Sequence, residues 1–161
     1  MKKIFFLIFS SAVFTFSTNA QSAAKAVFFE IGGPGVASLN YDMRFTKSES
    51  GIGGRIGFGG FSLGTGSERT TALFIPIGLT YLLGKDERNY FEVGGGVTPV
   101  VISDTYSGTT DNLRSTFGHL NIGYRMQPKA GGFFFRAAIN PVFGKGFFWP
   151  YYGGVAFGYK F

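Results

Sequence analysis

The chain has 161 residues, of which 45% are hydrophobic and 19% aromatic, and it contains 26 glycines and no cysteine. That apolar content excludes intrinsic disorder, and the lack of cysteine excludes a disulfide framework and any metal site built on thiolates. The formal net charge of +6 falls to +4 without Lys2 and Lys3, because thirteen basic residues then face nine acidic ones. The basic residues are scattered along the chain rather than clustered, so no nucleic-acid partner is expected.

The first residues have the pattern of a secretory signal peptide. Two lysines precede an apolar run over residues 4–14, and Thr18-Asn19-Ala20 follows that run. The run is too short to span a bilayer as a helix. We predict a signal peptide over residues 1–20, with Ala23 or Ala24 as alternative cleavage points, and one domain over residues 21–161.

The remainder of the chain predicts an all-β fold. Segments with a period of two, bounded by Gly, Pro, Asn, Asp or Ser, give eight candidate strands. Their expected ranges are 25–33, 36–45, 51–62, 70–83, 89–102, 116–126, 132–143 and 151–161. In the second of these, Leu39, Tyr41 and Met43 alternate with Asn40, Asp42 and Arg44. Such strands predict a single eight-stranded antiparallel up-and-down barrel.

The contents of the two strand faces indicate what surrounds the barrel. One face carries Leu, Ile, Val, Phe and Tyr, whereas the other carries Gly, Ala, Ser, Thr and nearly every charge within the strands. An eight-stranded barrel has an interior just wide enough for side chains, so the small and charged residues belong inside. The bulky apolar face then lies outside, which only lipid tolerates. A transmembrane barrel is therefore predicted rather than a soluble one.

Connection lengths predict the orientation. The turns at 46–50, 84–88 and 127–131 are short and charged, which is typical of the periplasmic side, and an even strand number places both termini there. The loops at 62–69 and 103–115 would then face outward, and residues 103–112 are the best candidate for contact with a surface partner. Three prolines fall inside predicted strands, where bulges or an early end to pairing are expected: Pro76, Pro99 and Pro141.

Aromatic residues gather where the predicted strands leave the membrane. With this orientation, six lie on the lipid face at the periplasmic ends, namely Phe45, Tyr81, Phe91, Tyr124, Phe133 and Phe161. A second group at the outer end comprises Phe147, Phe148, Trp149, Tyr151 and Tyr152. We interpret both groups as the aromatic girdles of a membrane barrel.

The final strand resembles those of known membrane barrels. Val155, Phe157, Tyr159 and Phe161 share one face of a strand that closes on an aromatic residue. With the strand pattern, this ending resembles the small eight-stranded outer-membrane barrels of Gram-negative bacteria, the class of the OmpA transmembrane domain and OmpX. The resemblance covers residues 25–161. It implies insertion into the outer membrane by the barrel-assembly machinery, through a C-terminal signal formed by these four residues.

Strand parity assigns a set of polar residues to the lumen: Glu30, Asp42, Arg44, Arg55, Glu92, His119, Asn121, Arg125, Arg136, Asn140 and Lys160. Charges in a narrow lumen must be paired or hydrated, because an isolated buried charge is very costly. We therefore predict a hydrogen-bonded network that plugs the barrel. A narrow path for ions or small solutes is the alternative.

No catalytic motif emerges from the sequence. A lipid A-modifying hydrolase is the strongest enzymatic alternative, but the single histidine lies in His119-Leu120-Asn121 rather than in the His-x-Ser that the outer-membrane deacylases require. No cofactor and no metal are expected. The sequence favours a structural or surface-binding barrel, monomeric, with outer-membrane lipid and lipopolysaccharide as its surroundings.

Overall fold

The computed structural model describes residues 23–161 apart from 66, 67, 107 and 108. The predicted signal peptide and the boundary at residue 20 lie outside the described residues. The described chain is almost entirely strand, and no helix in it is long and apolar enough to cross a membrane. Its elements are β1 (Lys25–Gly32), the 3-10 helix η1 (Gly33–Gly35), β2 (Ala37–Arg44), β3 (Gly51–Thr65), β4 (Glu68–Phe74), β5 (Ile77–Leu83), β6 (Asn89–Tyr106), β7 (Thr109–Met126), β8 (Gly132–Ile139), β9 (Val142–Gly144), β10 (Phe147–Trp149) and β11 (Gly153–Lys160).

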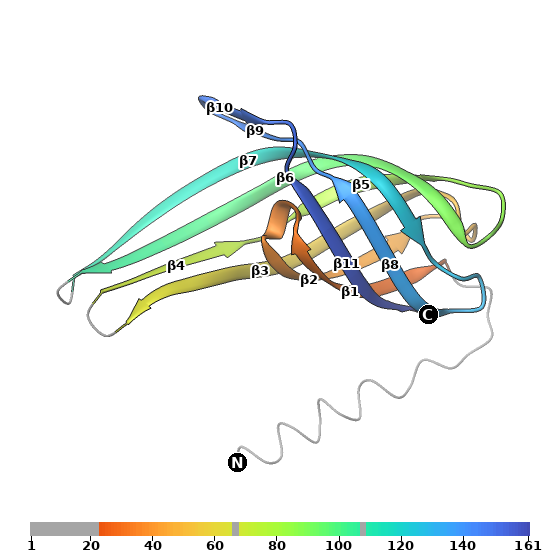
Figure 1. Ribbon diagram of the computed structural model, residues 1–161, viewed down its shortest axis with the longest axis horizontal. Helices are drawn as coiled ribbons and strands as arrows, with labels where there is room; N and C mark the ends of the chain where they lie inside the picture. Colours follow the sequence, from red (N-terminus) through yellow and green to blue (C-terminus); the bar gives the residue numbers. More distant parts are fainter. Residues whose placement is uncertain (1–22, 66–67, 107–108) are drawn as a thin grey trace, which may run out of the picture.

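The strands form one antiparallel sheet that closes on itself (Figure 1). Closure is made by β1 and β11, which pair from Ala26↔Lys160 to Gly32↔Gly154. The eleven strands form the eight strands of a barrel, which we call staves: β4 with β5, β8 with β9, and β10 with β11 are each two segments of one interrupted barrel strand. The predicted eight-stranded antiparallel barrel is confirmed.

Burial alternates along the staves in the sense expected for a membrane barrel. In β1, Ala26, Phe28 and Glu30 are buried, whereas Val27 and Phe29 between them are exposed. Across the barrel, Leu39 and Phe157 are 58% and 47% exposed, while Arg44 and Arg136 are 0% and 1% exposed. Polar groups therefore fill the axis and apolar groups cover the outside, the reverse of a soluble barrel.

Four strands continue far beyond the rest at one end of the barrel. β3 and β4 form one hairpin and β6 and β7 another, and both run past the rim formed by the other strands (Figure 1). The predicted outer loops at 62–69 and 103–115 are thus largely strand, and the prediction of loops there was wrong. Ser and Thr were interpreted as loop formers, but they make cross-strand bonds, Ser62 Oγ to Thr71 Oγ1 at 3.0 Å and Ser103 Oγ to Asn112 Oδ1 at 2.6 Å.

Pro76 and Pro99 interrupt the ladder without shifting its register. Gly59↔Phe74 before Pro76 and Ile56↔Ile77 after it follow the same register, so no residue is inserted there. Each proline still accepts a hydrogen bond: Pro76 O from Gly57 N at 2.8 Å and Pro99 O from Ile75 N at 3.0 Å. The bulge or early end expected at these two prolines is therefore not found, because each costs the sheet only its own missing donor.

Pro141 is handled as predicted, by a bulge. The pairs Ile139↔Gly153 and Val142↔Trp149 bracket it, and the β10–β11 side holds one residue more between them than the β8–β9 side. An extra residue reverses the side-chain phase beyond it. Trp149 consequently shares the face of Val142, which is paired with His119 of the lumen. Its predicted place on the lipid-facing girdle is corrected.

Both termini of the described chain and the short turns lie at the other end of the barrel (Figure 1). Lys129 Nζ, in the β7–β8 turn, donates to Glu87 Oε1, in the β5–β6 turn, at 2.7 Å. This hydrogen bond and the charge of Glu87 raise the pKa of Lys129. Both side chains are well exposed, so the pair adds little stability and serves mainly to align the two turns.

Candidate functional site

An unbroken chain of ion pairs fills the lumen. It runs in the order Arg55, Glu30, Arg136, Glu92, Arg125, Asp42 and Arg44. Acid and base alternate along it, so each carboxylate meets two arginines. The side chains come from six strands, β1, β2, β3, β6, β7 and β8, and are at most 5% exposed. All seven were assigned to the lumen by strand parity.

Glu92 and Arg136 hold the centre of this chain. Arg136 Nε donates to Glu92 Oε1 at 3.0 Å, and Arg136 Nη1 donates to Glu30 Oε1 at 2.5 Å. Arg125 Nη1 approaches the other Glu92 oxygen at 3.4 Å. Asn121 donates to Glu92 and accepts from Arg136, so the predicted amide joins the network as a bridge. The planar guanidinium suits this role because it presents several donors in fixed directions.

Asp42 and Arg44 anchor the end of the network nearer the short turns. Asp42 Oδ1 accepts from Arg44 Nη2 and from Arg125 Nη2, each at 2.8 Å. Arg44 also donates to the Thr80 hydroxyl at 2.6 Å and to the Gly51 carbonyl at 3.0 Å. At the opposite end of the network, Arg55 donates to Glu30 and, through Nε, to Asn40 Oδ1 at 3.0 Å. Most of the charged groups thereby receive the extra hydrogen bonds that a buried ion pair needs, although the buried Nε of Arg44 has no partner.

Several buried lumen aromatics were not identified from the sequence. Phe28 and Phe134 are fully buried and stacked, with ring centroids 4.7 Å apart. The guanidinium carbon of Arg125 lies 4.8 Å from the Phe134 centroid, and that of Arg55 lies 5.4 Å from the Phe28 centroid. The rings therefore fill space between the arginines and offer them cation–π contacts. Their shared parity with Glu30 and Arg136 could have revealed them.

Lys160 and His119 lie in the lumen but outside the ion-pair chain. Lys160 Nζ donates to Glu49 Oε1 at 2.7 Å and to the Lys129 carbonyl at 2.6 Å, which ties β11 to two turns. His119 Nδ1 lies 3.1 Å from Thr98 Oγ1, nearer the outer rim. It is buried on the lumen side, so it does not face lipid as the base of a lipid hydrolase would. Asn140 lies 3.5 Å from Arg136 Nη2, at the edge of the network.

The outer surface carries the other predicted residues. Six of the seven proposed girdle aromatics are exposed on the lipid side, namely Phe45, Tyr81, Phe91, Tyr124, Phe133 and Phe161. The exception is Trp149, which lies on the other face. The four residues of the predicted assembly signal, Val155, Phe157, Tyr159 and Phe161, are exposed together on one face of the last stave. Their role in assembly stays a prediction.

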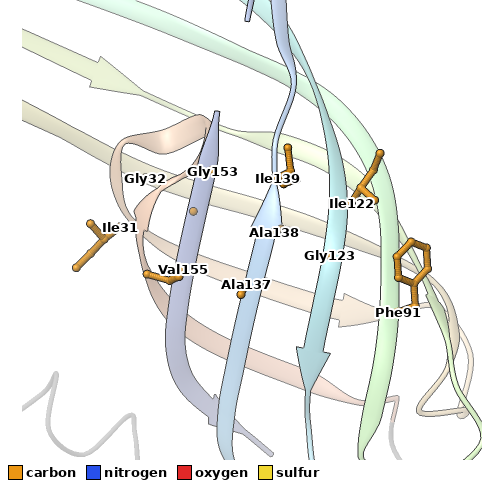
Figure 2. Close-up of a pocket in the computed structure, with 11 residues that line it drawn as sticks. Ile31, Gly32, Phe91, Ile122, Gly123, Ala137, Ala138, Ile139, Gly153 and Val155 are labelled. Carbon is orange, nitrogen blue, oxygen red and sulfur yellow. The ribbon is translucent and has the colours of Figure 1, made fainter. Parts of the chain in front are cut away.

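A shallow groove of about 820 Å³ crosses the lipid side over β1, β11, β8 and β7 (Figure 2). Ile31, Val155, Ile139 and Ile122 project around it, and the small residue Ala137 lies between them. Its lining side chains are all apolar, without the few convergent polar groups that orient a bound substrate. The groove is therefore a dent in the apolar outer wall without the features of a substrate site.

Closed staves, an ionic interior and an apolar exterior together define the fold of a small transmembrane β-barrel. Solved structures share the fold. The N-terminal β-barrel domain of Pseudomonas aeruginosa OprF matches with a TM-score of 0.63 and 13% identity, over 88% of this chain and 98% of that one. Ail, the attachment invasion locus protein of Yersinia pestis, matches with a TM-score of 0.54 and 11% identity, over 87% and 97%.

Neisserial surface protein A gives a similar match, with a TM-score of 0.51 and 9% identity over 86% of this chain and 91% of that one. No protein-family model matches the sequence, and no curated protein matches it. At these identities the likeness establishes the fold, which is that of the outer-membrane barrels to which the sequence was compared, and not a shared activity.

Proposed function

We propose that this barrel is a closed support in the outer membrane, with its lumen plugged by the ion-pair chain and its long strands available for binding at the cell surface. The observation that carries the proposal is the unbroken sequence of pairs from Arg55 to Arg44. Conduction needs a continuous column of water along the axis. Four arginines, three carboxylates and the stacked Phe28 and Phe134 occupy that axis instead.

Conductance in planar lipid bilayers tests the closed lumen. The purified protein is expected to give no steady current, whereas Arg136→Ser, which removes the bridge between Glu30 and Glu92, is expected to give small openings. Arg69→Ser is the matched control, because that arginine lies on the exposed part of β4. Steady current through the unaltered protein would contradict the closed lumen and would mean that the barrel is a narrow channel.

We infer the orientation of the barrel from its unequal ends. The termini and short turns occupy one end and the long hairpins the other, as expected if the termini face the periplasm. Because the chain has no cysteine, single substitutions can report exposure in intact cells. Asn112→Cys is expected to react with a membrane-impermeant maleimide, and Lys85→Cys only after the cells are broken. The reverse labelling pattern would mean that the barrel has the opposite orientation in the membrane.

The surroundings of the barrel are inferred from its surface. The apolar band is expected to contact outer-membrane lipid and lipopolysaccharide, and the last stave to be recognised by the barrel-assembly machinery. A barrel whose sheet closes within one chain needs no second subunit, so a monomer is expected. We expect neither a cofactor nor a nucleic-acid partner. Loss of outer-membrane insertion in Phe161→Ser, but not in Phe148→Ser, would support the assembly role.

A further inference from the structure

The strands beyond the barrel form what we call the outer sheet: residues 60–65 of β3, 68–74 of β4, 98–106 of β6 and 109–117 of β7. Pairing across it fixes which side chains share a face. Phe61, Ala72, Ile102 and Leu113 form one row, and the adjacent row consists of Ser62, Thr71, Ser103 and Asn112. The first row continues the lumen side of the barrel, and the second continues its lipid side.

The lumen side of the outer sheet is apolar. Leu63, Leu113 and Phe61 are 65%, 63% and 40% exposed, whereas Ala72 is buried between its neighbours at 3%. The Phe61 and Phe74 rings pack with centroids 6.0 Å apart. These residues lie beyond the lipid-facing band, so they are exposed to water rather than to hydrocarbon. A contiguous apolar surface in water marks a place where something binds.

The β9–β10 hairpin adds aromatic residues to the same side. Because of the phase reversal at the bulge, Phe147 and Trp149 lie on the lumen side of the hairpin instead of the lipid side. Phe147 packs edge-on against Phe117 of β7 at 6.5 Å between ring centroids, and Trp149 lies 6.1 Å from Phe147. Both aromatics stay exposed. The lumen side of the outer sheet is thus extended at its β7 edge by two more rings.

Charges on the outer sheet are sorted by face. Glu68, Asp104 and Asp111 lie on the lumen side near the tip, beyond the apolar row. Arg69 and Arg114 lie on the lipid side of the same strands. Asp104 accepts a hydrogen bond from Thr70 Oγ1 at 2.9 Å, which holds its carboxylate on the lumen side. The apolar surface therefore has an acidic rim.

We propose that this acidic-rimmed apolar face binds a basic amphipathic segment of a partner polypeptide. The partner's apolar side chains would cover Phe61, Leu63 and Leu113, and its basic side chains would reach Asp104 and Asp111. The inference deepens the proposed surface-binding role and rests on it. It names the chemistry of the partner for that role.

The charge of the rim favours a basic peptide over two other ligands that could cover an apolar face, lipopolysaccharide and a second copy of this chain. A lipopolysaccharide phosphate would be repelled by the three carboxylates. A second copy that met this one through the same face would bring the two acidic rims together, because a twofold contact pairs like with like. Of these three ligands, only the basic amphipathic peptide complements both the apolar face and its acidic rim.

Binding of synthetic peptides to the full barrel tests the proposal. The protein is reconstituted in phosphatidylcholine nanodiscs, which carry no net charge, and empty discs give the background. A fluorescent peptide of Leu and Lys is expected to bind above that background. Matched peptides of Leu and Glu, or of Ser and Lys, are expected to bind at least tenfold more weakly. Equal binding of the Leu–Lys and Leu–Glu peptides would overturn the proposal.

Paired substitutions on the two faces locate the contact. Asp104→Asn with Asp111→Asn is expected to weaken binding about 2- to 30-fold, the range for losing two exposed ion pairs. Leu63→Ser with Leu113→Ser is expected to weaken it roughly tenfold or more, because apolar contact area is lost. Arg69→Gln with Arg114→Gln, at similar depth on the opposite face, is the control and should not weaken it.

A loss confined to the arginine variant would place binding on the lipid side and overturn the proposal, as would Leu–Lys binding no stronger than to empty discs. Either result would leave the closed lumen standing, because that is decided by conductance. Conversely, a conducting barrel that binds the Leu–Lys peptide through the lumen side would retain the peptide site and reject the plug.

Discussion

The same four staves, formed by β3, β4 with β5, β6 and β7, carry opposite polarity in two regions of the molecule. Within the barrel, β7 turns Asn121 and Arg125 inward and Leu120 and Ile122 outward. In the outer sheet the same strand has apolar Leu113 on the lumen side and polar Asn112 on the lipid side. The alternation is unbroken between them, so only the residue types exchange places.

This exchange indicates that the surrounding medium, hydrocarbon or water, determines which face of a strand is apolar. On β6 the change falls between Val97, on the lipid side, and Ile102, on the lumen side. Hydrocarbon requires an apolar exterior below that point, whereas water above it permits polar groups outside. We therefore expect the hydrocarbon layer to end at this inversion on these strands.

The largest expected effect comes from breaking the buried network. Glu92→Gln leaves Arg125 and Arg136 each short of a charged partner, and we expect the free energy of unfolding to fall by about 3–5 kcal/mol. Urea unfolding in phosphatidylcholine vesicles, followed by the fluorescence of the single tryptophan, measures it. Glu68→Gln in the outer sheet should change the value by less than about 0.5 kcal/mol. Similar losses in both variants would remove the distinction between the regions.

The next effect tests the boundary on the lipid side. Leu79→Arg places a charge on the lipid-facing surface of β5 and should cost about 2–4 kcal/mol, the range for arginine near the bilayer midplane. Thr71→Arg places the same charge on the same side of the same stave, above the inversion, and should cost under about 0.5 kcal/mol. The same unfolding measurement compares them. A comparable cost at Thr71 would mean that hydrocarbon extends over the outer sheet.

Sequence patterning predicted the barrel but not the outer sheet. Within the membrane both faces of a strand are constrained, so the parity of Asp42 or Arg125 assigns it to the lumen. Beyond the membrane that constraint ends, and the Ser- and Thr-rich run from 103 to 112 resembles a loop although residues 103–106 pair with residues 109–112. The apolar Leu113 between the polar Asn112 and Arg114 could have indicated that the alternation continues.

The pairing partners inside the lumen could not be predicted from the sequence either. Parity gives the face of each residue but not the stagger between staves, which decides that Arg136 reaches Glu30 and Glu92 while Lys160 reaches Glu49. The reversal at Trp149 depends on one inserted residue near Pro141, which shifts the phase without any periodic signal. Both features are properties of register between strands and not of a single strand.

A smaller effect tests whether lumen glycines make room for arginine. A Cβ added at Gly53 would overlap the guanidinium of Arg44, which Asp42 and Thr80 hold in place. We expect Gly53→Ala to cost about 1–3 kcal/mol, the range for overpacking. At Gly153, on the lipid side, the nearest atom to an added Cβ is 3.6 Å away, so Gly153→Ala is the control and should be nearly neutral. Equal costs would mean that glycine serves backbone geometry alone.

The smallest effect concerns a carboxylate outside both regions. In the β5–β6 turn, Asp86 accepts from the side chain of Asn89 at 2.6 Å and from the amides of Asn89 and Arg88 at 2.7 and 3.1 Å. These hydrogen bonds, the side-chain bond first, lower the pKa of Asp86. A lowered pKa in the folded state means that the turn's contribution is complete above about pH 4 and is lost as pH falls through the folded value.

The measurement is the urea midpoint of the unaltered protein and of Asp86→Ala at neutral and at acid pH. A small difference is expected at pH 7, and it should shrink toward pH 3 because the protonated carboxyl no longer accepts these bonds as strongly. Titration of the lumen carboxylates affects both proteins alike and cancels in the comparison. Ser48→Ala, in the β2–β3 turn, is the control, since its effect involves no ionisable group and should be the same at both pH values. A difference for Asp86→Ala that is constant with pH would show that the turn depends on shape and not on the charge of this carboxylate.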